Sequence, residues 1–209
     1  MRALTLAIWA AFSDAGFSGL GLDLLCGIVL GVCVMSAVPL IGRLIGFLMD
    51  CVMRGLSSIS DGHTANMIAN YVTFPGVILH ELSHAVGAKI SGAKIESIRL
   101  FEPDGQSLGC VEYSCRGKRR RDMAFQRALS SCAPVLGGFV CIHVFLAMAN
   151  WAGPYWPLAL MSWHGIFSMA CHMDMSRQDM KSYIKGCVWL LPYVIMVCTV
   201  VAYYIGHNA

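Results

Sequence analysis

Residues 76–88 read GVILHELSHAVGA, and this stretch places the pattern H-E-x-x-H inside an otherwise apolar segment. On a helix, His80 and His84 are four residues apart, so their imidazoles leave the same face one turn apart. That spacing lets two ring nitrogens occupy two corners of a zinc (Zn2+) tetrahedron. Glu81 lies beside His80, close enough to reach a water at the metal without being a ligand, and is the expected general base.

The alternative is an ordinary helix that carries two histidines by accident. The location of the motif weakens this alternative, because ionisable side chains are costly in a membrane-spanning segment and indicate function by default.

The composition is that of a membrane protein. Hydrophobic residues make up 57% of the 209 residues and charged residues only 13%, whereas a soluble domain has about a quarter charged residues. We expect an all-α integral membrane protein that forms a single polytopic domain over residues 1–209. The ten cysteines are scattered and suggest no disulfide framework. Cys110 and Cys115 are interpreted as strand or loop residues rather than as metal ligands.

Five segments are apolar enough to be predicted as transmembrane helices. A shorter apolar segment, residues 3–12, is predicted to be an uncleaved interfacial helix, with a cleaved signal peptide as the alternative. Residues 43–56 are predicted to extend the first span along the interface. The predicted spans are residues 24–41, 66–88, 123–149, 157–172 and 187–205.

Residues 93–121 differ from the spans and are predicted to form a small β-hairpin followed by a basic loop on the cytoplasmic side. Residues 94–101 largely alternate apolar and polar side chains, Pro103-Asp104-Gly105 is a turn signal, and residues 108–113 form a plausible returning strand. The basic run RGKRRR at 116–121 is interpreted as an anchor near anionic lipid, and no nucleic-acid binding is expected.

The distribution of Lys and Arg predicts the orientation. With the 89–122 loop in the cytoplasm, thirteen of the fifteen basic residues lie on that side, and Arg43 and Arg54 are the exceptions. The N-terminus is then cytoplasmic and the C-terminus outside, in a membrane interpreted as the bacterial inner membrane. His80 and His84 lie toward the cytoplasmic end of the second span, and the end of the fourth span reaches the same side.

A catalytic zinc site usually has three protein ligands, so a third is expected. Asp174 and Asp179 both lie where the fourth span meets the cytoplasmic side, and spacing alone does not choose between them. The pattern Ser176-x-x-Asp179 also fits a helix cap. His172 and His164 are further candidates, although His164 lies nearer the middle of the membrane, where it is expected to form a hydrogen bond to a neighbouring helix, as is His143. His63 is expected to lie in a solvated loop.

Four features, in this order along the chain, resemble the site-2-protease-like family of intramembrane zinc metalloproteases. They are HELSH, a strand beginning Ala93-Lys94-Ile95-Glu96-Ser97-Ile98, Ala133-Pro134 in the next span, and a late Asp. The resemblance covers roughly residues 66–185. It implies that Asp179 joins His80 and His84 as the third zinc ligand, in a segment that the family commonly writes as Asn-Pro-x-x-Asp-Gly. Here that segment is Met175-Ser176-Arg177-Gln178-Asp179-Met180, so the Asp matches and the usual Asn, Pro and Gly are absent.

The expected function is hydrolysis of a peptide bond in or next to the membrane, with a membrane protein or peptide as substrate and the lipid bilayer as surroundings. Two alternatives stay open. One is a zinc hydrolase of a non-peptide membrane substrate, and the other is a non-catalytic membrane scaffold or binding protein with a relic metal site. The sequence names neither the substrate nor the oligomeric state.

Overall fold

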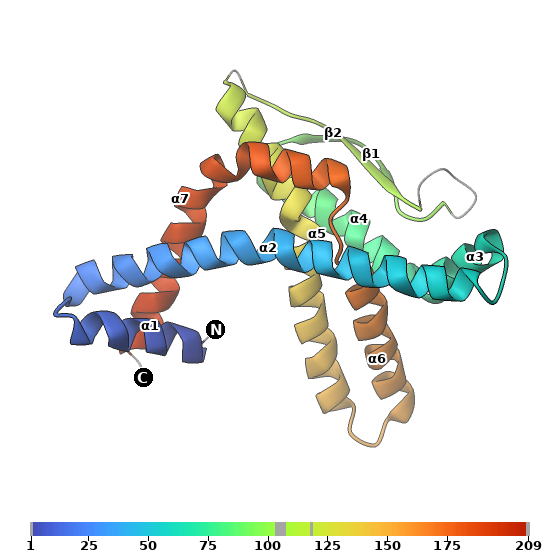
Figure 1. The fold of residues 1–209 in the computed structure, drawn as a ribbon, viewed down its shortest axis with the longest axis horizontal. Coiled ribbons are helices and arrows are strands. Elements are labelled where there is room, and N and C mark those ends of the chain that lie inside the picture. The colour runs from blue at the N-terminus through green and yellow to red at the C-terminus, as the bar shows by residue number, and fades with distance from the viewer. Residues whose placement is uncertain (1, 103–107, 118, 208–209) are drawn as a thin grey trace. The chain divides into compact units, whose positions relative to one another are not determined.

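The computed structural model describes residues 2–102, 108–117 and 119–207. The chain is mostly helical, with one small antiparallel hairpin, as the sequence predicts (Figure 1). The helices are α1 (Arg2–Asp14), α2 (Gly19–Ser57), α3 (Gly62–Val72), α4 (Phe74–Ile90), α5 (Arg120–Ala152), α6 (Trp156–Cys171) and α7 (Arg177–His207), and the strands are β1 (Lys94–Arg99) and β2 (Cys110–Ser114).

Three of the described helices, α2, α5 and α7, are long and apolar enough to cross a membrane, against the five spans predicted from the sequence. The predicted second span is divided between α3 and α4, and α4 has 17 residues. The predicted fourth span is α6, with 16 residues. At 1.5 Å per residue these two helices are about 24–26 Å long, shorter than the roughly 30 Å of a hydrocarbon core.

The described residues pack into two compact units. One consists of Met1–Ala37 with Cys187–Ala209, and the other of Val38–Gly186. The first unit is held together by a buried apolar cluster that is partly covered by side chains of α1. The cluster is formed by Leu22, Cys26, Leu30, Cys198 and Ala202. That the whole chain acts as a single membrane domain stays a prediction.

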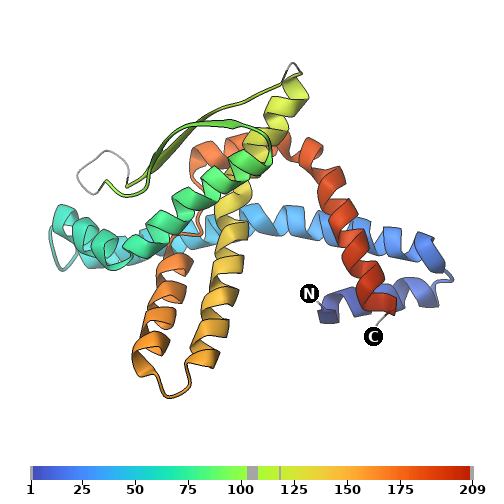
Figure 2. The ribbon, with the colours of Figure 1, turned by 180° about the vertical axis from the view of Figure 1, so that it is seen from behind.

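The Val38–Gly186 unit contains the H-E-x-x-H motif, on α4. Helix α4 packs against α5 and α6, and the β-hairpin lies along α4 in both views (Figures 1 and 2). Helices α5 and α6 form an antiparallel pair joined by a short turn. Close approach of α4 and α5 needs a glycine, because a Cβ at Gly87 would lie 2.7 Å from the Cβ of Ala133.

The chain breaks between α3 and α4 at Thr73, where the sequence predicts one span over residues 66–88. Pro75 occupies the first turn of α4, where its missing N–H leaves no hydrogen bond unmade. The break is tied to α6, because Ser168 Oγ donates to the Thr73 carbonyl at 2.7 Å and accepts from the Gly76 N–H at 2.7 Å. His164 Nε2 donates to the carbonyl of Val72 at 2.7 Å. Neighbouring side chains thus satisfy backbone groups at the break.

The hairpin confirms the predicted strands, with Lys94 opposite Ser114 and Arg99 opposite Cys110. A register irregularity lies between Ile95 and Ser97. The predicted turn at residues 103–105 and Lys118 of the basic run lie outside the described residues.

Candidate metal centre

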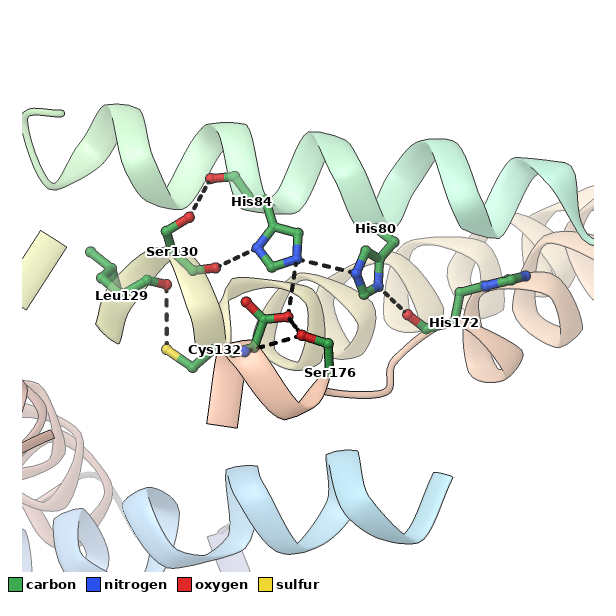
Figure 3. A network of polar contacts seen from close by, with 8 residues as sticks. His80, His84, Leu129, Ser130, Cys132, His172 and Ser176 are labelled. Atoms are coloured by element: carbon green, nitrogen blue, oxygen red, sulfur yellow. Dashed lines mark hydrogen bonds and ion pairs between the residues drawn. The ribbon is translucent and has the colours of Figure 1, made fainter. Parts of the chain in front are cut away.

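The two motif histidines face the same side of α4, as their spacing predicts (Figure 3). Their ring centroids are 4.8 Å apart, and the Nε2 atoms of His80 and His84 are 3.2 Å apart. Both rings lie in the space between α4, α5 and the chain after α6, because His84 contacts Ser130 of α5 and His80 contacts His172.

The other ring nitrogen of each histidine is held by a backbone carbonyl. His80 Nδ1 lies 2.5 Å from the carbonyl oxygen of His172, and His84 Nδ1 lies 2.8 Å from the carbonyl oxygen of Ser130. A carbonyl oxygen can only accept, so each Nδ1 carries the hydrogen and donates it. The hydrogen bond at Nδ1 fixes the tautomer, as it commonly does in metal-binding histidines. In a neutral ring of this tautomer, Nε2 has a free lone pair.

Both carbonyls are available because their own helices do not use them. In a straight helix the Ser130 carbonyl would accept from the N–H of residue 134, but Pro134 lies inside α5 and has no N–H. His172 is the capping residue directly after α6, and the last carbonyls at a helix end lack a donor in the helix. A helix-interior proline and a helix end therefore supply the two acceptors that orient the histidines.

Two Nε2 lone pairs that face each other at 3.2 Å repel unless a positive charge lies between them. That charge is either a proton on one ring or a metal ion. Two ligands in a zinc tetrahedron with bonds of about 2.0–2.1 Å are separated by about 3.3 Å. The observed Nε2–Nε2 distance therefore fits two corners of a zinc site as well as it fits a hydrogen bond.

Asp179 comes to this pair from the first turn of α7. Its Oδ2 lies 3.9 Å from His84 Nε2, and the same oxygen accepts a hydrogen bond from Ser176 Oγ at 2.6 Å. Ser176 Oγ in turn accepts from the Asp179 N–H at 3.0 Å, so the expected capping pattern is present. Ser176 thus holds the Asp179 carboxylate in place, and the same carboxylate is directed toward the histidines.

Two imidazoles and a carboxylate are the donor chemistry of a catalytic zinc site. The Nε2 atoms of His80 and His84 have the separation expected for two ligands of one zinc ion. The distance from Asp179 Oδ2 to His84 Nε2 is about half an ångström longer than that separation. Across the ranges that the structure describes, no set of three or more His, Cys, Asp or Glu side chains is already arranged to hold a metal.

Comparisons with known proteins give no match: no family model, curated protein or solved structure matches the chain. The geometry of the chain's own residues therefore carries the functional argument, and the assignment of zinc ligands remains a prediction.

Glu81 lies on the side of α4 that faces the hairpin. A Cβ at Gly109, just before β2, would lie 2.6 Å from Glu81 Cγ, so the stem of Glu81 packs against that glycine. Among the described residues, no hydrogen bond or ion pair to the Glu81 carboxylate is found. Its oxygens are therefore available to a water molecule beside the histidines.

The side chains of the other candidates, His172 and Asp174, make no hydrogen bond or ion pair with the rings of His80 and His84 among the described residues, although both residues lie close to His80. The ring of His172 points away from His80 (Figure 3), and its Nε2 lies 2.7 Å from Thr73 Oγ1, whose hydroxyl donates to the Ala69 carbonyl. His172 therefore orients His80 through its backbone, and its Nε2 is occupied as a donor. Asp174 lines a separate cavity with residues of α2, and burial raises the pKa of its carboxyl.

The remaining histidines and the two hairpin cysteines behave as ordinary structural residues. His164 donates to a neighbouring helix, and His143 Nδ1 donates to the Phe139 carbonyl of its own helix at 2.7 Å, as expected. His63 is exposed, but it lies in the first turn of α3 and not in the predicted loop. Cys110 and Cys115 are free thiols.

Sequence reasoning missed the roles of Ser130 and of the His172 carbonyl. The signal for Ser130 was present, because a proline inside an apolar helix always frees the carbonyl four residues earlier. The His172 carbonyl carried no such signal, since its role depends on where α6 ends.

A cavity of about 670 Å3 runs beside β2, next to this centre. It is lined by β2 and the following Cys115, and on the other side by Arg127 of α5 and Gln178 and Ser182 of α7. Because β2 pairs with β1 on one edge only, its second edge is free of a strand partner among the described residues.

Proposed function

We propose that the protein is a membrane-embedded zinc metalloprotease that hydrolyses peptide bonds in or next to the bilayer. One observation carries the proposal: two motif histidines with locked Nδ1 donors direct their Nε2 lone pairs at one point, and an aspartate from a distant helix approaches it. Such convergence from α4 and α7 is what a three-ligand catalytic site needs.

In this proposal His80, His84 and Asp179 hold the metal. A zinc ion there would supply Lewis-acid polarisation of the scissile carbonyl and lower the pKa of water to about 7. The Ser130 and His172 carbonyls keep the imidazoles in the required tautomer, and Ser176 orients the carboxylate of Asp179.

Glu81 is the proposed general base. Its carboxylate takes a proton from the attacking water and passes it to the leaving amine. The carboxylate suits this role because its stem is packed against Gly109 while its oxygens have no described partner.

The cavity beside β2 is the proposed substrate groove. An extended peptide could pair with the free edge of β2, and its side chains would meet Arg127, Gln178 and Ser182. The substrate is then a membrane protein or peptide that unwinds locally before cleavage.

The membrane setting is supported by three helices that are long and apolar enough to cross it. Their surfaces expose large apolar side chains such as Leu40, Val140 and Val200, which a lipid environment would cover. We further propose that α4 and α6 lie in the bilayer as shorter segments, with the N-terminus in the cytoplasm of a bacterial cell.

The test uses the purified full-length chain in proteoliposomes with a library of membrane peptides. Zinc content and cleavage are measured for wild type, Glu81→Gln, His80→Ala and Asp179→Ala, with Asp174→Asn as the matched carboxylate control. We expect about one zinc per wild-type chain, lost in the His80 and Asp179 variants and kept in Asp174→Asn. Glu81→Gln should keep zinc and lose cleavage, and normal cleavage by this variant would refute the mechanism.

A second candidate is a non-catalytic membrane protein with a relic metal site. It is favoured by the 3.9 Å separation of His84 Nε2 and Asp179 Oδ2, which exceeds the distance between two zinc ligands. Bound zinc without any Glu81-dependent hydrolysis of peptides would support this candidate, and hydrolysis of lipids instead of peptides would point to a zinc hydrolase of another substrate class.

A further inference from the structure

A cavity lined by four basic side chains lies where α5 and α7 begin. Arg120 and Arg127 line it from α5, and Lys181 and Lys185 line it from α7. The cavity has a volume of about 670 Å3, and its other lining side chains, among them Met123 and Ser182, carry no charge. It therefore gathers four positive charges and no negative one.

The nearest carboxylates in the sequence are engaged elsewhere. Asp122 pairs with Arg121, at 3.4 Å between Oδ1 and Nε, and Asp179 is held by Ser176 beside His84. In the part of the chain that the structure describes, no carboxylate lies within ion-pair distance of any of the four cavity cations. An uncompensated group of positive charges in a concave site attracts anions more strongly than scattered surface charges do.

The position of the cavity relates it to the membrane. Helices α5 and α7 are two of the three helices long and apolar enough to cross a bilayer, and the cavity lies at their charged N-terminal ends. Such ends lie at the level of the lipid headgroups, where basic pockets between helices bind anionic lipids. Met123 and Ala124 add apolar surface to the same cavity.

We propose that this cavity binds a phosphate-bearing anion, supplied either by the headgroup of an anionic phospholipid or by free phosphate. Arg120 and Arg127 can each present a planar fork to two phosphate oxygens, and Lys181 and Lys185 act as point charges. The site takes only Arg120 from the basic run at 116–121, so it differs from a general electrostatic anchor. It also does not depend on the proposed zinc chemistry.

The site borders the turn that carries Asp179, because Gln178, Lys181 and Ser182 of the cavity surround that residue on α7. A bound phosphate would therefore hold the turn of α7 from which the carboxylate of Asp179 reaches His84. On the proposed function, lipid composition would in this way affect the metal centre without any lipid touching it.

The experiment measures binding to the full-length protein in neutral detergent by native mass spectrometry. The probes are dioleoyl phosphatidylglycerol, dioleoyl phosphatidylcholine as the zwitterionic comparison, and inorganic phosphate. The test variant is Lys181→Gln/Lys185→Gln, and the matched control is Arg119→Gln/Arg121→Gln, which removes two charges from the basic run outside the cavity. We expect phosphatidylglycerol to bind about 25-fold more weakly to the test variant, about fivefold for each cation removed, and less than threefold more weakly to the control.

Phosphatidylglycerol binding that inorganic phosphate does not displace would identify the lipid headgroup as the source. Binding of inorganic phosphate alone, with the same sensitivity to the lysine variant, would identify free phosphate. Lys181→Arg/Lys185→Arg should keep the binding, which excludes loss through misfolding, and Glu81→Gln should bind as wild type does. Equal losses in the test and control variants would overturn the proposal, and so would equal binding of both lipids without phosphate binding.

Discussion

Pro134 controls the orientation of His84 although it does not touch the ring nitrogens. Replacing it by alanine restores an N–H at position 134, which can donate to the Ser130 carbonyl in the normal helical pattern. The restored bond competes with the 2.8 Å hydrogen bond from His84 Nδ1. A hydrogen bond of this kind contributes about 1 kcal/mol net, so its loss corresponds to about a fivefold change in an equilibrium constant.

We therefore expect Pro134→Ala to weaken zinc affinity by about fivefold, and by more if the carbonyl also moves, since substitutions of orienting partners cost 10- to 100-fold in other metal sites. The assay is competition with a fluorescent zinc chelator, using the detergent-purified protein. The matched control is Pro192→Ala, which removes the proline inside α7 in the other compact unit. Unchanged zinc affinity in Pro134→Ala, with a melting temperature like that of the wild type, would refute the role assigned to the freed carbonyl.

Two further predictions concern packing and pH. Gly87→Ala should lower the free energy of unfolding by about 1–3 kcal/mol, because the new Cβ would lie 2.7 Å from Ala133 Cβ. The control is Gly55→Ala, where a new Cβ would have no neighbouring atom within 4 Å, so this variant should be neutral or stabilising. Both are measured in a denaturation assay. Burial raises the pKa of Asp174, so the folded chain holds this proton more tightly than the unfolded chain. The free energy of unfolding should then decrease as pH rises from the pKa of Asp174 in the unfolded chain through its pKa in the folded chain. Melting temperatures of Asp174→Asn, measured against pH, should lack this decrease. A pH profile of Asp174→Asn identical to that of wild type would contradict the raised pKa of Asp174.

The histidine geometry could be predicted from the sequence because it is local. The i, i+4 spacing fixes the relation of His80 and His84 as soon as the segment is helical, and the structure places both rings on one side of α4. The break at Thr73 could not be predicted in the same way. It depends on Ser168 and His172, which lie 95 and 99 residues later in the chain.

Spacing alone left Asp174 and Asp179 open as the third ligand, the resemblance implied Asp179, and the structure brings Asp179 within 3.9 Å of His84. Both aspartates follow α6 closely, and only the path of the chain between α6 and α7 decides which one approaches His84. The number of long apolar helices was overestimated for a related reason. Hydropathy shows that a segment is apolar, but the length of α4 is set by the break before it and by the hairpin after it.

On the proposal that α4 lies in the bilayer, the shortness of this helix has a consequence for the lipid surroundings of the candidate metal centre. A helix about 25 Å long is shorter than an average hydrocarbon core, and such a mismatch is relieved when the bilayer thins locally or when the flanking residues reach toward the interface. In bilayers made from short acyl chains the two histidines would lie nearer to water than in bilayers made from long ones. Acyl chain length would then set how easily water enters the centre, so the same protein would respond to the thickness of the membrane that contains it.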